Sequence, residues 1–268
     1  MNKIVIKIIV LLIITSLLLG CYQKIDKTTE KSVINPDEEK KDMNGFIKKE
    51  TEHFIFNYKI DDKKAVDDLA KILEENYERI INDIKPTIEL STIKVFVYPS
   101  IDEFHKAVYK PDASDGFVGY AISATEFAIV SPNNPGTVHN YEYMLKTAVH
   151  EFTHIVVGSL RMPPRWLNES IALYEAKQFI DPSNLKFMMK GEHPNFANNN
   201  FVSMDSRVYA IGYTIIEFMV EKWSMEKVRK LIKEKGNLED NMIKILNVTP
   251  REFEKQWFNF VYDKYLKN

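Results

Sequence analysis

The sequence predicts an α+β fold, in which a small α/β subdomain at residues 46–138 precedes a mainly helical subdomain at residues 139–268. Three observations support this. Alternating strand patterns are confined to the first part, where one long helical stripe separates them, and helical periodicity dominates after the turn at residues 133–136. The chain is also 45% hydrophobic over 268 residues, which is enough to bury a core in one large domain or two small ones.

Composition excludes several classes of protein. A chain with 45% hydrophobic and 28% charged residues is neither disordered nor a collagen-like repeat nor a coiled coil. Its formal net charge of −2 offers no basic surplus, so we expect no nucleic-acid partner. The single cysteine excludes a disulfide scaffold and a thiolate zinc site. Any metal ligands must therefore be histidines and carboxylates.

The amino terminus reads as a targeting segment rather than as part of the fold. Lys3 and Lys7 are followed by an uncharged apolar run from Ile8 to Leu19, which is shorter than the roughly 20 residues of a membrane span. The run ends in Leu18-Leu19-Gly20-Cys21, which resembles the lipobox of bacterial lipoproteins. The resemblance implies cleavage of the signal peptide at residues 1–20, lipidation of Cys21 and a chain anchored outside the cytoplasm. Residues 21–45 are charged and poor in large apolar residues, as is typical of a flexible tether.

The α/β part is expected to contain four strands and two helices. Strands are predicted at 53–58, 92–98, 116–122 and 126–130, with a long helix between the first two. That helix is marked by apolar residues in steps of three and four: Val66, Leu69, Leu73, Tyr77, Ile80 and Ile84. A Ser-x-x-Glu capping box at residues 100–103 predicts a short helix after the second strand.

The second part is expected to be helical near residues 141–159, 165–179, 206–223, 225–235 and 250–266. Thr249, Pro250 and Glu252 supply the cap, the first-turn proline and the reaching glutamate of the last of these helices. The remaining histidines, His53, His105, His139 and His193, are expected on the surface or in loops.

One helical stretch carries the sequence His150-Glu151-Phe152-Thr153-His154. Two histidines four residues apart lie about 40° from each other around a helix axis, so both imidazoles can reach a single ion. Neutral imidazole nitrogens suit zinc. Glu151 lies about 100° from His150 around the axis, beside the ion, where it can hold and deprotonate a water.

The third ligand decides the class of zinc site. The metzincin pattern requires Gly and His at the positions of Val157 and Leu160, so that class is excluded. Prolines at 163 and 164 separate the zinc helix from a following helix, on which Glu169 shares a face with small and apolar residues. Glu175 points about 120° away from Glu169 around that helix. Glu169 is therefore the predicted third ligand. A purely structural reading would bury two histidines and two carboxylates without compensation.

The combination of HEFTH with PRWLNESIALYE resembles the gluzincin metallopeptidases, in particular the peptidase MA-like group of bacterial secreted proteins. The likeness extends more faintly over residues 46–235. It implies a zincin-type helical subdomain, with His150, His154 and Glu169 as ligands of Zn²⁺ and Glu151 as general base.

The resemblance also implies a second oxyanion donor from a downstream helix. The family has a tyrosine at the start of that helix, which corresponds to Tyr209, and Tyr213 one turn later is the rival. The alternative to both is a buried aromatic residue with no catalytic role. Two departures stand out: Ser170 replaces the usual glycine, and the G-x-M-E-N segment of the aminopeptidase branch is absent. The nearest stretch to that segment is 119–126. The strand at 126–130 is expected to offer its edge to a substrate backbone.

These observations predict a membrane-tethered, extracytoplasmic zinc metallopeptidase that hydrolyses internal peptide bonds. Its expected partners are a peptide or protein substrate and, through the lipid anchor, the bacterial cell membrane; nothing requires more than a monomer. The alternative is a binding or scaffolding lipoprotein that keeps the fold and the metal with little turnover. Glu151 favours the enzyme, because a site that only binds metal has no need of a base there.

Overall fold

The computed structural model describes residues 45–194 and 206–267, within one compact unit that spans residues 39–268. The predicted signal peptide, Cys21 and all of the predicted tether except Gly45 lie outside the described residues. No helix in the described part combines the length and the hydropathy that a membrane span requires.

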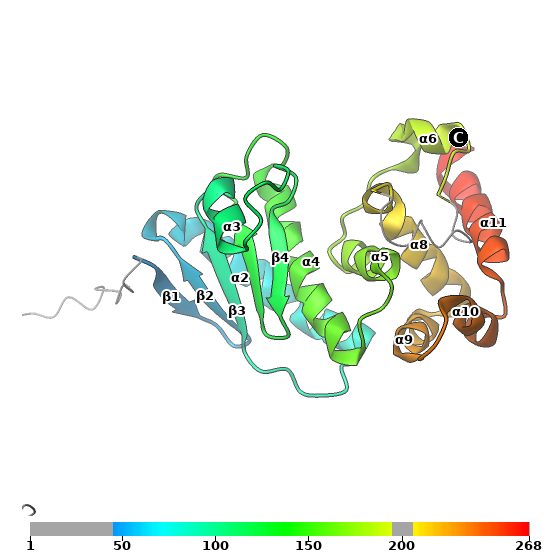
Figure 1. The fold of residues 1–268 in the computed structure, drawn as a ribbon, viewed down its shortest axis with the longest axis horizontal. Coiled ribbons are helices and arrows are strands. Elements are labelled where there is room, and N and C mark those ends of the chain that lie inside the picture. Colours follow the sequence, from blue (N-terminus) through cyan, green and yellow to red (C-terminus); the bar gives the residue numbers. More distant parts are fainter. Residues whose placement is uncertain (1–44, 195–205, 268) are drawn as a thin grey trace, which may run out of the picture. The chain divides into compact units, whose positions relative to one another are not determined.

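A five-stranded mixed sheet forms the first part of the unit, and the second part is mostly helical, which confirms the α+β class (Figure 1). The strands lie in the order β1-β2-β3-β5-β4. The three inner strands, β2 (Phe54–Tyr58), β3 (Ile93–Tyr98) and β5 (Glu126–Val130), are parallel to one another. The edges are β1 (Ile47–Glu50) and β4 (Gly119–Ser123), each antiparallel to its neighbour. All four predicted strands are present, and β1 was not predicted.

Two long helices, α2 (Lys63–Ile84) and α4 (Tyr141–Leu160), pack against each other and against the sheet. In β2, alternate residues Phe54, Phe56 and Tyr58 are buried, as expected for a strand with one face in the core. Phe54 meets Tyr77 of α2 and Phe152 of α4 in edge-to-face ring contacts. The helix that carries the two histidines is therefore fixed on the rigid sheet.

The short predicted helix is α3 (Ile101–Ala107), and the Ser100 side chain caps it by accepting a hydrogen bond from the Glu103 amide. The expectation that His105 lies on the surface is wrong. This histidine lies in α3 and is 4% exposed, and its Nε2 donates to the Phe117 carbonyl at 2.9 Å. Burial is tolerated because the ring finds that acceptor.

The helical part begins with α5 (Arg165–Glu175) and α6 (Lys186–Met189). It continues with α8 (Val208–Trp223), α9 (Met225–Lys233), α10 (Leu238–Leu246) and α11 (Pro250–Val261), after which a π-helical turn covers Tyr262–Leu266. The capping box of Thr249 and Glu252 is present, whereas α10 was not predicted. The helix α4 lies after the predicted boundary at residue 138, and it contacts both β4 of the first part and α5 of the second.

Two contacts fix the position of α5. Gly212 of α8 lies so close to α5 that a Cβ there would be 2.7 Å from Leu173 and 2.9 Å from the Ser170 hydroxyl. At the other end of α5, the Glu175 carboxylate is fully buried and pairs with Arg79 of α2, which also donates to the Glu175 carbonyl at 2.6 Å. Glu175 thus points away from the histidines, as its helical position predicts.

Candidate metal centre

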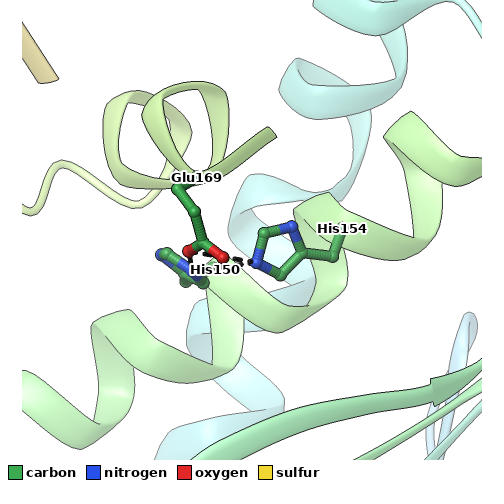
Figure 2. A group of neighbouring side chains, drawn as sticks. All are labelled: His150, His154 and Glu169. Atoms are coloured by element: carbon green, nitrogen blue, oxygen red, sulfur yellow. Dashed lines mark hydrogen bonds and ion pairs between the residues drawn. The ribbon is translucent and has the colours of Figure 1, made fainter. Parts of the chain in front are cut away.

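Two turns of α4 and one turn of α5 bring three candidate ligands together (Figure 2). His150 Nε2 and His154 Nε2 lie 3.0 Å apart. Glu169 Oε2 lies 3.4 Å from the first nitrogen and 3.8 Å from the second. Within the described residues, this is the group of histidine and acidic side chains whose ligand atoms converge closely enough for one ion. The ligand atoms of the three predicted residues therefore converge around one point.

The dimensions of this group fit a zinc ion. Donors that hold zinc tetrahedrally at 2.0–2.1 Å lie about 3.3 Å from one another. The three separations of 3.0, 3.4 and 3.8 Å bracket that value, so the group has the size that a zinc ion requires. Two imidazole nitrogens with one carboxylate oxygen form a donor set that zinc favours, and an ion held by these three side chains would have room for water or substrate.

A hydrogen bond to its outer ring nitrogen orients the His150 imidazole. His150 Nδ1 donates to Gln178 Oε1 at 2.8 Å, so in the neutral ring the Nε2 lone pair faces the other ligands. Gln178 in turn donates to the Thr147 hydroxyl at 3.4 Å. His154 Nδ1 and Asn168 Oδ1 are both buried without a hydrogen bond. The Asn168 side chain nevertheless lies near enough to oppose, in small part, the lowering of the pKa of His154.

The ligands influence one another electrostatically. Burial lowers the pKa of His150, but hydrogen bonding and charge from Glu169, together with the charge of Glu151, raise it above the ordinary value. Burial and the neighbouring His150 lower the pKa of His154 to about 4. Burial raises the pKa of Glu169, and the two histidines outweigh it, so that pKa is lowered overall. The two carboxylates around His150 therefore favour a positive charge at this place.

Glu151 lies beside the group, under the edge strand β4. A Cβ on Gly119 would be only 2.5 Å from Glu151 Oε1, so the bare glycine backbone leaves the space that the carboxylate fills. The Ala121 amide faces the same carboxylate. Burial is the main cause that raises the pKa of Glu151 to about 7. A carboxyl group with that pKa can both accept and return a proton near neutral pH.

A cleft of about 1060 Å³ opens over this group. It is lined by α4, by the start of α5, by Tyr209 of α8 and by residues 116–124, which include the whole of β4. The strand at 126–130 was expected to offer its edge, and this is wrong: β5 lies between β3 and β4, so both of its edges are paired. The edge that faces the cleft is that of β4.

The two tyrosines left open by the sequence lie in different surroundings. Tyr209 lines the cleft, and its hydroxyl accepts a hydrogen bond from Arg165 Nη2 at 2.8 Å. Burial and the charge of Glu169 raise the pKa of Tyr209, so its phenol keeps its proton at neutral pH. Tyr213 is not among the residues that line the cleft and packs against Tyr174 and Phe179. Of the two tyrosines, the geometry favours Tyr209 as the candidate for the second oxyanion donor.

Sequence reasoning missed a second phenol. Tyr143 lines the cleft seven residues before His150, a spacing that places both on one face of α4 and could have identified it. Its ring stacks on that of His139, with 4.1 Å between the ring centroids and an angle of 5° between the ring planes. His139, which was expected on the surface or in a loop, also lines the cleft. Burial, followed by the charge of Glu151, raises the pKa of Tyr143. Gln178 and Arg165 were also missed: Gln178 lies 28 residues from His150 and Tyr209 lies 44 residues from Arg165, although the one-turn spacing of Arg165 and Glu169 could have indicated the arginine.

No protein-family model matches the chain, and a search of curated proteins finds no significant match.

Proposed function

We propose that the chain is a zinc-dependent peptidase that cleaves internal peptide bonds with Glu151 as general base. The observation that carries this proposal is the convergence of His150 Nε2, His154 Nε2 and Glu169 Oε2 at 3.0–3.8 Å, next to a buried carboxyl group with a pKa of about 7. A metal site with a purely structural role is usually closed by a fourth protein ligand. Here three ligands face a cleft.

Each residue has a chemical task in this proposal. Zinc held by the three ligands would polarise the peptide carbonyl and lower the pKa of water towards about 7. Glu151 accepts the proton of the attacking water and returns it to the departing amine. Tyr209 donates its O–H to the carbonyl oxygen as negative charge develops there. Gln178 keeps His150 in the tautomer that leaves Nε2 free for the metal.

The cleft supports an extended peptide as substrate. Its wall includes the edge strand β4, whose outer backbone groups can pair with a substrate strand. Among the described residues that line it, the only carboxylates are Glu151 and Glu169, both of which have tasks at the metal centre. No further acidic group of that lining is available to hold a free amino terminus. This favours cleavage within a chain over removal of terminal residues.

The decisive experiment measures metal content and cleavage of a peptide library by the purified full chain. We expect one zinc per chain and cleavage at internal bonds. Glu151→Gln should keep the zinc and lower kcat by 10²–10⁴-fold, the usual range for a general base. Glu142→Gln is the matched control, because Glu142 is exposed in the first turn of the same helix. Full activity of Glu151→Gln would refute the proposed base. Zinc without cleavage would favour the alternative of a binding lipoprotein.

The location of the protein is proposed from the sequence alone. We propose that Cys21 carries lipid and anchors the peptidase to the outer face of the bacterial cell membrane. Replacing Cys21 by serine should release the protein from the membrane fraction without changing the peptidase activity. Retention of the Cys21→Ser variant in membranes would contradict the anchor.

A further inference from the structure

Arg165, the first residue of α5, contacts both Glu169 of the metal group and the Tyr209 phenol. Arg165 Nη2 donates to Tyr209 Oη at 2.8 Å, and Arg165 Nε lies 3.8 Å from Glu169 Oε1. Arg165 and Glu169 are one turn apart on α5, and Tyr209 is the second residue of α8. The two helices pack closely, so the backbone positions from which Arg165 and Tyr209 reach each other are fixed.

The donor chemistry of this pair determines where the phenol proton can point. A guanidinium group has only donors, so the Tyr209 oxygen is the acceptor in the bond to Arg165. The phenol O–H cannot then point at Arg165 and must donate in another direction. Tyr209 lines the same cleft as His150, His154 and Glu169, and Glu169 contributes to the raised pKa of its phenol, so the metal group lies among the acceptors that the O–H can reach.

We propose that Arg165 is a positioning residue that fixes the Tyr209 phenol with its O–H directed at the carbonyl oxygen of a bound peptide. The inference rests on the proposed peptidase function. Without the arginine, a phenol that is 40% exposed at the rim of a cleft samples several rotamers and donates to water. Only a donor already aimed at the developing charge stabilises the transition state without reorganisation. Arg165 itself transfers no proton.

A role in stability alone explains the arginine poorly. The Arg165 side chain is 57% exposed, and exposed ion pairs at one-turn spacing contribute little to folding. Its replacement should therefore leave the fold and the zinc content intact. The replacement should lower kcat, and this loss should depend on the presence of the Tyr209 hydroxyl.

A double-mutant cycle on the zinc-loaded full chain tests this route. Tyr209→Phe should lower kcat by about 10²-fold, as for loss of one oxyanion donor. Arg165→Met should lower kcat by about 10-fold with little change in KM, and should cost less than 2-fold more in the Tyr209→Phe background. Arg165→Lys, which can still donate one hydrogen bond, should recover part of the loss. Arg251→Met, an exposed arginine in the first turn of α11, is the matched control for loss of a positive charge. Additive losses in the cycle would overturn the proposal.

A second readout does not depend on activity. With tyrosine labelled by ¹³C at Cζ, the Tyr209 resonance, assigned by its loss in Tyr209→Phe, should shift and broaden in Arg165→Met, with or without zinc. An unchanged resonance would overturn the positioning role even if kcat falls. If the wild-type chain bound zinc but cleaved no peptide, the proposed function would fail. The resonance would still decide whether Arg165 positions Tyr209.

Discussion

Gly119→Ala is the substitution that most directly tests where the general base lies. The added Cβ would be 2.5 Å from Glu151 Oε1 and 2.9 Å from its Cγ and Cδ, whereas ordinary Cβ contacts begin at 3.4 Å. The Glu151 carboxylate must therefore retreat by about 0.5–0.9 Å, since contacts under 3.0 Å are essentially never seen. Gly119 is not among the glycines with positive φ, so alanine is not excluded by the backbone itself.

A displacement of that size has a large effect on catalysis. Misplacing a catalytic group by about 1 Å can cost about 10²-fold in rate, which corresponds to about 2.7 kcal/mol of activation free energy. We expect kcat of Gly119→Ala to fall by about 10²-fold, while zinc content and thermal stability stay near those of the wild type. The assay compares cleavage of one identified peptide with metal content in the same preparation.

Gly158→Ala is the matched control. Gly158 also lines the cleft, but a Cβ there would meet nothing closer than Met162 Cε at 4.0 Å. Because Gly158 lies within α4, alanine should stabilise the helix by about 0.5–1 kcal/mol and leave kcat unchanged. If Gly119→Ala kept full activity with its zinc bound, the position assigned to the Glu151 carboxylate during catalysis would be refuted.

Three further predictions concern the metal and the fold. Gln178→Leu should weaken zinc binding by 10–100-fold, because His150 loses the acceptor that sets its tautomer, whereas Gln178→Glu keeps an acceptor and should keep the zinc affinity. Competition with a chromophoric chelator measures the zinc affinity of each variant. Equal affinities of the two variants would contradict the role of Gln178. In the Glu151→Gln variant, zinc affinity should fall about tenfold per pH unit below the raised pKa of His150, because proton and ion compete for Nε2; a flat profile between pH 5 and 6.5 would contradict this. Arg79→Met should lower the free energy of unfolding by about 3 kcal/mol at pH 8, since it strands the buried Glu175 carboxylate. Burial raises the pKa of Glu175 to about 7 even beside Arg79, which lowers it, so this pKa should rise further in Arg79→Met. The loss should therefore shrink between pH 8 and pH 6, because the carboxyl group of the variant takes up a proton before that of the wild type; urea titrations at the two pH values test the difference.

The metal group could be predicted from the sequence because its geometry is local. His150 and His154 are one turn apart on one helix, and Glu169 lies on the next helix, so the 3.6-residue period alone indicates which side chains face each other. The same period correctly directed Glu175 away from the histidines. Here the local rules and the tertiary structure agree.

The order of the strands was harder to predict, because alternation identifies strands and says little about their neighbours. Residues 127–130 of β5 are all buried, whereas β4 is mostly exposed. A continuous apolar run is typical of a strand covered on both faces, and this signal could have placed β5 inside the sheet. Gly119 and Gln178 could not have been found, because their neighbours at the site are brought to them only by the folded chain.

The short span of chain between the first and last proposed ligands has a consequence for how the proposed ion would be acquired. Residues 150 to 169 lie on two consecutive helices, so a bound ion would cross-link one helical hairpin and no distant segments. The sheet and the packing of α8 on α5 involve no ligand bond. A zinc finger is unfolded without its metal, whereas this protein should fold to its native state first and bind the ion afterwards. We therefore expect a chelator to strip the ion reversibly, with unchanged far-ultraviolet circular dichroism before and after the metal is restored.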